Sequence, residues 1–430
     1  MELYHNSRAT EYRNPYGAVP VGTALRLRLD VKMAEPERVF LRLWTGQETL
    51  VPMKRTAEGQ YEAEILTPKQ PGLLWYYFLV ELSGNTVCFG RDTGGAGKII
   101  ENPESWQVTV YQEQKLPDWY RNSVVYQIFP DRFHRGADWL SCQDRAAHPE
   151  GWKGTKRIVM QDWDDTPFYC RDEKLRVTRW PFFGGSLQGI TEKLPYLKSM
   201  GVGTIYLNPV FLASSNHKYD TADYMTIDPG FGTEADFQAL CAQAKTMGIR
   251  IILDGVFSHT GDDSVYFNRY GNYPEPGAYD KAGSPYDSWY RFGDQHPAGY
   301  ECWWGVDSLP DVEENDPGYR EFICGEQGVI RKWLRLGASG WRLDVADELP
   351  DSFIAAVRSA CKAEKADALL MGEVWEDASH KISYDHLREY LLGRELNCTM
   401  HYPFRDGAVA FILGRRSAED FAEDMESIRE

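Results

Sequence analysis

The first hundred residues alternate apolar and polar side chains in short runs that are separated by turn residues. Leucines and arginines alternate over residues 25–29, a second run covers residues 39–44, and an aromatic run covers residues 73–82. Alternation with a period of two is typical of strands that bury one face. We therefore predict an all-β sandwich as a first domain, over residues 1–111.

A polar segment and a change of rhythm follow this domain. Residues 112–120 begin with polar side chains and contain a proline, which is typical of a linker. In the remaining domain, residues 121–430, helical faces alternate with glycines and short apolar strands. One such unit has apolar side chains at helical spacing over residues 187–197, then a glycine, then the apolar run 204–207.

Four of the predicted strands end on a polar side chain, namely Asn208, Asp254, Asp344 and Glu373. Apolar strands separated by helices indicate a parallel α/β sheet. A doubly wound sheet shares this rhythm, but no strand is followed by the glycine-rich loop of the nucleotide-binding kind. We therefore predict a parallel (β/α)8-type barrel with these four side chains on one rim. Residues 258–311 are too long for an ordinary loop and predict a small excursion over that rim.

Composition limits the partners and the compartment. The net charge of -17 disfavours nucleic acid and anionic membranes, which a negative field repels. No run reaches the roughly 18 apolar residues of a membrane helix, and the start of the chain lacks the pattern of a signal peptide. The eight cysteines lack the spacing of a zinc site, which favours reduced thiols and a cytoplasmic location. The aromatic share of 13% suits sugar binding and core packing alike.

Two carboxylates on strand ends form the candidate catalytic pair. In glycoside cleavage one carboxylate attacks the sugar and another carboxyl group protonates the leaving oxygen. Arg342 lies two residues before Asp344, on the same strand face, and we expect it to keep that carboxylate ionised. The apolar neighbours of Glu373 favour a raised pKa and hence a protonated acid. Two rim carboxylates in ordinary ion pairs are the alternative interpretation.

Four segments resemble the signature regions of a known enzyme family. They are Asp-Gly-Val-Phe-Ser-His at 254–259, Gly-Trp-Arg-Leu-Asp-Val-Ala-Asp-Glu at 340–348, Gly-Glu-Val-Trp at 372–375 and Asn-His-Lys-Tyr-Asp-Thr-Ala-Asp-Tyr at 216–224. Together they resemble the alpha-amylase superfamily of glycoside hydrolases, especially the neopullulanase, cyclomaltodextrinase and maltogenic amylase branch. The resemblance covers residues 121–406 and, more weakly, the first domain, which is similar to a carbohydrate-binding module.

The resemblance implies the reaction and its catalytic residues. The reaction is cleavage of alpha-glucosidic bonds in maltooligosaccharides, cyclodextrins, pullulan or starch, with retention of configuration through a covalent glycosyl-enzyme intermediate. Asp344 is implied to be the nucleophile and Glu373 the acid/base, with Arg342 orienting Asp344.

The same resemblance implies four substrate-binding residues. Asp254 and His259 are implied to hold sugar hydroxyls, which suits their hydrogen-bonding groups. Tyr219 is implied to stack under the sugar, although core packing explains a tyrosine equally well. Glu348 is implied to lie toward the acceptor side.

The chain departs from the family pattern. Ser258 and Asp347 stand where this branch usually has asparagine, and the first change puts in doubt a calcium site associated with that region. The family's fourth region, a His-Asp pair that supplies a third carboxylate, is not found. Residues 401–404 resemble the sixth strand of the family, and the sequence ends at Glu430. Because open barrel edges are unfavourable, we expect a barrel truncated after its sixth strand, in a fragment of a longer protein.

The expected reaction requires no cofactor, and calcium is one candidate ligand with unknown metal-binding residues. Aspartates within residues 131–185 could bind it, but a solvated acidic surface explains them as well. The expected partner is an alpha-glucan oligosaccharide, without nucleic acid or membrane, and the resemblance implies a homodimer. One alternative is a non-catalytic relative that binds alpha-glucans, or an inactive fragment that lacks the third carboxylate. Another alternative is a barrel enzyme of unrelated chemistry.

Overall fold

The structure is a computed structural model that describes residues 1–148, 150–173, 176–280 and 283–429. Positions 149, 174 and 175 of the acidic segment, positions 281 and 282 of the predicted excursion, and position 430 lie outside the described residues. The chain divides into two units. The first contains Met1–Lys115, Val374–Glu395 and Thr399–Glu430, and the second contains Leu116–Glu373 and Leu396–Cys398. The predicted boundaries at residues 111, 120 and 121 stay predictions.

Two sheets make up the N-terminal part of the first unit. One has the order β1 (Glu2–Tyr4), β4 (Ala24–Lys32), β8 (Gln60–Leu66) and β7 (Lys54–Ala57), with β2 (Arg13–Asn14) beside β4. The other has the order β11 (Gly97–Ile99), β10 (Asn85–Arg91), β9 (Gly72–Leu82), β12 (Trp106–Tyr111) and β3 (Val19–Pro20), with β5 (Arg38–Trp44) beside β9 and β6 (Glu48–Pro52) beside β5.

The alternation of side chains decides which face of each strand is buried. In β4 the three leucines at positions 25, 27 and 29 are fully buried, and in β9 Tyr76, Phe78 and Val80 are buried while the residues between them are only partly covered. These side chains form one hydrophobic cluster with Trp106 and other buried residues of both sheets. The predicted sandwich is therefore confirmed as a sandwich-like N-terminal region.

The first unit also contains a short hairpin and two C-terminal helices. The hairpin is β23 (Ile382–Ser383) with β24 (His386–Leu387), and the helices are α8 (Tyr402–Ile412) and α9 (Ala418–Arg429). The ring of Phe421 lies 5.7 Å from that of Phe404 and 6.2 Å from that of Phe411, so the two helices pack on each other through aromatic side chains.

The interpretation of residues 401–404 as a strand is wrong. His401 caps α8, since its ring nitrogen accepts a hydrogen bond of 3.3 Å from the backbone of Phe404. Pro403 occupies the first turn of the helix, where its missing N–H has no partner to lose, whereas a strand ladder needs that group. The strand at this place is β25 (Cys398–Thr399).

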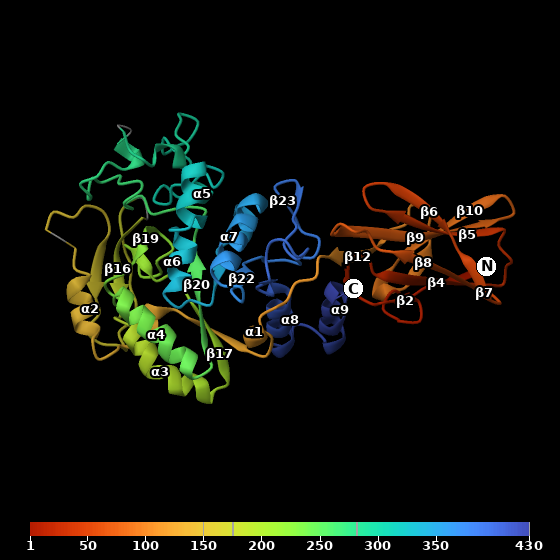
Figure 1. Cartoon of the computed structure of the whole chain (residues 1–430), viewed down its shortest axis with the longest axis horizontal. Helices are drawn as coiled ribbons and strands as arrows, with labels where there is room; N and C mark the ends of the chain where they lie inside the picture. Colours follow the sequence, from red (N-terminus) through yellow and green to blue (C-terminus); the bar gives the residue numbers. More distant parts are fainter. Residues whose placement is uncertain (149, 174–175, 281–282, 430) are drawn as a thin grey trace. The chain divides into compact units, whose positions relative to one another are not determined.

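A curled parallel sheet forms the centre of the second unit and includes β25 at one edge. In the described part of the chain its order is β13 (Val124–Ile128), β17 (Val202–Leu207), β20 (Arg250–Gly255), β21 (Gly340–Leu343), β22 (Leu369–Gly372) and β25. The pairs from β13 to β22 are parallel. The predicted parallel α/β sheet is confirmed (Figure 1), whereas the predicted truncation of a (β/α)8-type barrel stays a prediction.

The second unit contains the helices α1 (Asp118–Arg121), α2 (Trp139–Arg145), α3 (Leu187–Ser199), α4 (Glu234–Thr246), α5 (Pro317–Cys324), α6 (Val329–Arg335) and α7 (Asp351–Glu364). The predicted helical faces at residues 187–197 and 237–247 and the helix predicted to end near Gly337 correspond to α3, α4 and α6. α3 and α4 lie side by side (Figure 1), and both begin at side-chain caps, Ser186 and Thr233. No helix in the described ranges has both the length and the apolar character needed to cross a bilayer.

The second unit also contains shorter elements outside the parallel sheet. They are the strands β14 (Lys156–Val159), β15 (Cys170–Arg171), β16 (Val177–Phe182), β18 (Phe211–Ala213) and β19 (Thr221–Ile227), and the short helices η2 (Pro130–Arg132), η3 (Ala278–Asp280), η4 (Asp287–Trp289), η5 (Trp303–Gly305) and η6 (Ala346–Glu348). The segment after β20 has its own aromatic core, in which Phe267 contacts Tyr290 and Tyr300. Its two ends are joined by an antiparallel bridge between His259 and Asp311.

Candidate active site

Three neighbouring strands bring the predicted carboxylates to one edge of the sheet. Asp254 is the penultimate residue of β20, while Asp344 and Glu373 directly follow β21 and β22. In the parallel register Asp254 lies opposite Arg342, and Leu343 lies opposite Gly372, so the ends of the three strands are level. The three carboxylate residues are at most 9% exposed.

One guanidinium group joins all three carboxylates. The Nη1 atom of Arg342 lies 2.7 Å from Oδ1 of Asp254 and 2.7 Å from Oδ1 of Asp344. Its Nη2 atom lies 2.7 Å from Oε2 of Glu373. Arg342 is 3% exposed, so this cation and its partners are shielded from water. The predicted contact between Arg342 and Asp344 is present. Arg342 also contacts the carboxylates of Asp254 and Glu373, which was not predicted.

The expected difference in protonation between the two catalytic candidates stays a prediction, and the structure shows charged neighbours around both groups. Burial and the neighbouring carboxylate of Asp254 raise the pKa of Asp344, and the opposing effect of Arg342 does not cancel this rise. Glu373 does not lie in apolar surroundings, because it accepts hydrogen bonds from Arg342 and, at 2.9 Å, from the backbone of Val345. The local sequence could not show this, since the cation comes from the neighbouring strand.

Two phenol groups bind the remaining oxygen of Asp254. The hydroxyl of Tyr206 donates to Oδ2 of Asp254, and the hydroxyl of Tyr219 donates to the same atom over 3.0 Å. Burial raises the pKa of Asp254, whereas Arg342 and these hydroxyls lower it. The predicted binding residues Asp254 and Tyr219 are therefore in direct contact. Tyr206 was not among the predicted site residues, although it lies on β17 two residues before Asn208, which directly follows the strand.

A strained residue follows Asp344. Val345 has a φ angle of 34°, a left-handed conformation that a β-branched residue rarely adopts. This turn reverses the chain and directs the N–H of Val345 at Glu373. Strain of this kind is typical of functional sites, where the surrounding contacts hold it in place.

His259 and Glu348 lie beside a pair of stacked tryptophans. The ring of His259 lies 5.1 Å from that of Trp303, and Trp303 stacks on Trp304 at 5.3 Å. Burial lowers the pKa of His259 to about 4, so this imidazole is neutral near pH 7. The indole N–H of Trp304 donates to Oε1 of Glu348 over 3.1 Å, and Trp304 is 65% exposed. Trp304 was not among the residues predicted from the sequence.

The loop that carries Tyr219 is held by buried charges. Lys218 is fully buried, has a φ angle of 67° and forms an ion pair with the buried carboxylate of Asp228. Burial lowers the pKa of Lys218 to about 8, although Asp228 opposes this shift. On the other side of Tyr219, Asp220 accepts hydrogen bonds from the side chain and the backbone of Ser215. The conformation of Tyr219 is thus set by its two neighbours in the sequence.

A hollow of about 580 Å³ adjoins this loop in the second unit. Its lining includes Trp180, His217, Asp262, Asp263 and Arg269. Its mixture of aromatic, neutral and charged side chains is compatible with a polyhydroxylated ligand.

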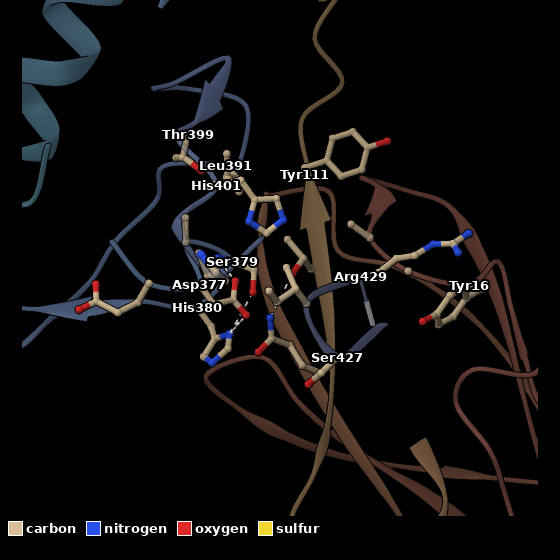
Figure 2. A pocket seen from close by; sticks show the side chains of 18 of the residues that line it. Tyr16, Tyr111, Asp377, Ser379, His380, Leu391, Thr399, His401, Ser427 and Arg429 are labelled. Carbon is tan, nitrogen blue, oxygen red and sulfur yellow. Dashed lines mark hydrogen bonds and ion pairs between the residues drawn. The ribbon is translucent and has the colours of Figure 1, made fainter. Parts of the chain in front are cut away.

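A second hollow, of about 660 Å³, belongs to the first unit and is lined by residues such as Tyr16, Trp75 and His401 (Figure 2). It also contains Ser379, His380 and Asp377. The hydroxyl of Ser379 and the carboxylate of Asp377 both approach the same nitrogen, Nδ1 of His380, at 2.9 and 3.5 Å. A catalytic triad needs the two groups on opposite ring nitrogens, so this cluster is a local turn and not a hydrolytic site.

Two aspartates of the segment that was considered for calcium accept hydrogen bonds from protein donors. The carboxylate of Asp131 accepts the backbone N–H groups of Phe183 and Gly184, and that of Asp138 accepts the hydroxyl of Ser186. Among the residues that the structure describes, no group of three or more His, Cys, Asp or Glu side chains is arranged to hold a metal ion. The calcium hypothesis stays a prediction.

Comparison with known proteins decides the family. Residues 127–426 match the family described as alpha amylase, catalytic domain. The chain belongs to the alpha-amylase family. The predicted resemblance is confirmed.

The chain is similar to three proteins that show its range of relatives. It is 39% identical to an amylopullulanase of Thermoanaerobacterium saccharolyticum over 456 residues, which cover 96% of the chain and 34% of that protein. It is 33% identical to neopullulanase 2 of Thermoactinomyces vulgaris, covering 96% of the chain and 66% of that protein. The solved structure of a cyclomaltodextrinase matches with a TM-score of 0.61 and 25% identity, over 99% of the chain and 69% of that structure. The chain thus spans about a third of the amylopullulanase and just under two thirds of the neopullulanase.

Proposed function

We propose that the protein is a retaining glycoside hydrolase that cleaves alpha-glucosidic bonds in alpha-glucans. The observation that carries this proposal is the contact of Arg342 with Asp254, Asp344 and Glu373 at the ends of three adjacent parallel strands. Chemistry at this edge is the rule for parallel barrels. Most glycosidases use a pair of carboxyl groups to cleave the glycosidic bond, and the family membership supports the same reaction.

In the proposed reaction Asp344 attacks the anomeric carbon while Glu373 donates a proton to the leaving glycosidic oxygen. Glu373 then removes a proton from a water molecule whose oxygen attacks the anomeric carbon, which breaks the bond to Asp344 and releases the sugar with its original configuration. Asp344 must therefore be ionised and Glu373 protonated in the substrate complex. Arg342 supports the ionised form of Asp344, and Asp254 accepts its donors without taking part in the bond changes.

The proposed substrate class is a neutral oligosaccharide such as a maltooligosaccharide, a cyclodextrin or pullulan. Tyr219 supplies a ring beside Asp254, and the neutral imidazole of His259 can donate to or accept from sugar hydroxyls. The exposed ring of Trp304, held by Glu348, offers a stacking surface on the proposed acceptor side. The relatives named neopullulanase and cyclomaltodextrinase support this substrate class.

Hydrolysis of maltohexaose, β-cyclodextrin and pullulan by the purified chain tests the proposal. We expect hydrolysis of at least one of them, release of the alpha anomer as seen by proton NMR, and loss of hydrolysis in Asp344→Asn and Glu373→Gln. Release of the beta anomer would contradict the retaining mechanism. Calorimetric binding of maltohexaose by a folded chain without any turnover would instead support the non-catalytic glucan-binding alternative.

We also propose a cytoplasmic location, which the unpaired state of the cysteines supports. The homodimer that the resemblance implies stays a prediction, and analytical ultracentrifugation of the chain tests it.

A further inference from the structure

A chain of hydrogen bonds leads from the first strand of the parallel sheet to the candidate active site. Nε2 of Gln127 donates to Oδ1 of Asn208 over 2.8 Å. Nδ2 of Asn208 donates to the hydroxyl oxygen of Tyr219 over 3.2 Å, and that hydroxyl donates to Oδ2 of Asp254 over 3.0 Å. Asp254 is in turn bound by Arg342, the residue that holds both catalytic candidates.

The direction of these bonds fixes the hydroxyl proton of Tyr219. Because Asn208 donates to the phenol oxygen, the phenol proton is free to be donated to Asp254. In the structure the amide N–H group of Gln127 donates to the carbonyl oxygen of Asn208, and this orientation leaves the N–H group of Asn208 to donate to Tyr219. The side chains of Gln127, Asn208 and Tyr219 are thus joined by hydrogen bonds that end at the carboxylate of Asp254.

The backbone holds Asn208 firmly at this place. Its N–H donates to the carbonyl of Ile128 over 2.9 Å, which ties the end of β17 to β13. The residue is 9% exposed. Thr204, Tyr206 and Asn208 alternate along one strand and share one face, so Tyr206 and Asn208 approach Asp254 from the same strand, directly and through Tyr219.

We propose that Asn208 is a positioning residue of the glycosidase reaction, which acts by holding the ring and hydroxyl of Tyr219 in place, with Gln127 as its support. This inference rests on the proposed function. Asn208 acts through Tyr219 and not through contact with the reacting atoms. Its replacement should therefore slow the reaction in a chain that has the hydroxyl of Tyr219, and should have little effect in a chain that lacks it.

A double-mutant cycle on the full chain tests this dependence. We expect Asn208→Leu to lower kcat/KM for maltohexaose by about tenfold, as for the loss of one neutral hydrogen bond at the site. In a Tyr219→Phe background the same substitution is expected to change kcat/KM by less than about twofold. Asn208→Asp is expected to cost more than Asn208→Leu, because its carboxylate accepts the phenol proton and draws it away from Asp254. Additive effects in the cycle would overturn the proposal.

Thr204→Val is the matched control. Thr204 lies on the same strand face, is fully buried, and shares one hydrogen bond of 2.7 Å with Ser123 away from the carboxylates. It is expected to lower thermal stability about as much as Asn208→Leu while leaving kcat/KM unchanged. An equal loss of kcat/KM in both variants would assign Asn208 a merely structural role and overturn the proposal.

A second readout does not require activity. With tyrosine labelled by carbon-13 at Cζ, the resonance of Tyr219 is assigned from its absence in Tyr219→Phe. We expect it to shift in Asn208→Leu and to stay in place in Thr204→Val. An unchanged resonance in Asn208→Leu would overturn the proposed contact. A shifted resonance in a folded chain that hydrolyses no glucan would uphold the contact and refute the proposed function instead.

Discussion

At the scale of single residues, the charge balance of the site is its most informative property. Three buried carboxylates share one buried guanidinium group, so the site as a whole carries more negative than positive charge. Repulsion from Asp254 therefore adds to burial in raising the pKa of Asp344. A neutral sugar can enter such a site without adding further charge, whereas an anionic ligand is repelled.

Replacing Asp344 by asparagine is expected to separate activity from stability. Activity falls by at least about 10⁴-fold if Asp344 is the nucleophile. Because folding raises the pKa of Asp344, its ionised form destabilises the folded chain at pH values above that pKa, and the neutral amide removes this cost. We expect the free energy of unfolding in urea to rise by about 1 kcal/mol at mildly alkaline pH.

Asp347→Asn is the control for this experiment, since Asp347 lies in the same segment and is only partly buried. It should leave both activity and stability close to those of the unchanged chain. If Asp344→Asn lost so much stability that unfolding alone explained its loss of activity, the proposed role would be contradicted.

The dependence of kcat/KM on pH is expected to show the raised pKa of Asp344. Attack requires the ionised carboxylate, so activity falls as the pH drops through that pKa. Because the pKa lies above the ordinary value of 3.8, the acidic limb should begin at a higher pH than for an exposed aspartate. The measurement is kcat/KM for maltohexaose across the acidic and neutral range. Full activity maintained down to pH values near 3.8 would show that the raised pKa does not belong to the reacting group.

The sequence identified which residues meet at the site, but not their electrostatics. Asp344 and Glu373 could be predicted because each follows an apolar strand, and such strand ends converge in a parallel sheet. The environment of Glu373 could not, because its cation, Arg342, lies 31 positions away in the sequence. The left-handed turn at Val345 was equally hidden, since valine is among the residues least expected there.

At the scale of elements, the loop between β18 and β19 shows how the fold positions a binding side chain. Tyr219 stands between Lys218, which is buried against Asp228, and Asp220, which is bound by Ser215. The motif around Tyr219 therefore includes structural residues as well as the side chain that faces the site.

Replacing Lys218 by methionine is expected to destabilise the fold strongly. The substitution leaves the fully buried carboxylate of Asp228 without its nearest cation, and breaking such a pair costs about 3–5 kcal/mol. The free energy of unfolding in urea measures this cost. Lys245→Met on the exposed face of α4 is the control and should change it by less than about 0.5 kcal/mol. A loss at position 218 no larger than at position 245 would show that the ion pair does not hold the loop.

Elements with strong periodicity were predictable, and elements set by local exceptions were not. The strands of the parallel sheet and helices α3 and α4 follow apolar patterns that leave few alternatives. Residues 401–404 were misassigned because histidine and proline act there as a helix cap and a first-turn residue. The strands β14, β15 and β16 are short and half-exposed, so no buried pattern marked them.

At the scale of the whole chain, a sandwich-like region and a parallel α/β sheet occur together in one alpha-amylase family member. The structure shows each of the eight cysteines as a free thiol, and the reducing compartment that composition favours stays a prediction. Periodicity could not predict that residues 374–395 and 399–430 would cluster with the N-terminal sandwich, because that grouping depends on contacts between segments far apart in sequence.

Titration of the thiols tests the proposed compartment. In denaturant without reductant, the purified chain is expected to react with a thiol reagent at all eight cysteines. Six or fewer reactive thiols, with the missing pairs restored by a reductant, would point to disulfides and an oxidising compartment.

The most direct test of the central claim is to trap the proposed covalent intermediate. The chain is incubated with a 5-fluoro-alpha-glucosyl fluoride, digested and analysed by peptide mass spectrometry. We expect one added fluoroglucosyl group, located on Asp344 and absent from Asp344→Asn. A label on another carboxylate, or active hydrolysis with no label and with inversion at the anomeric carbon, would contradict the proposed role of Asp344.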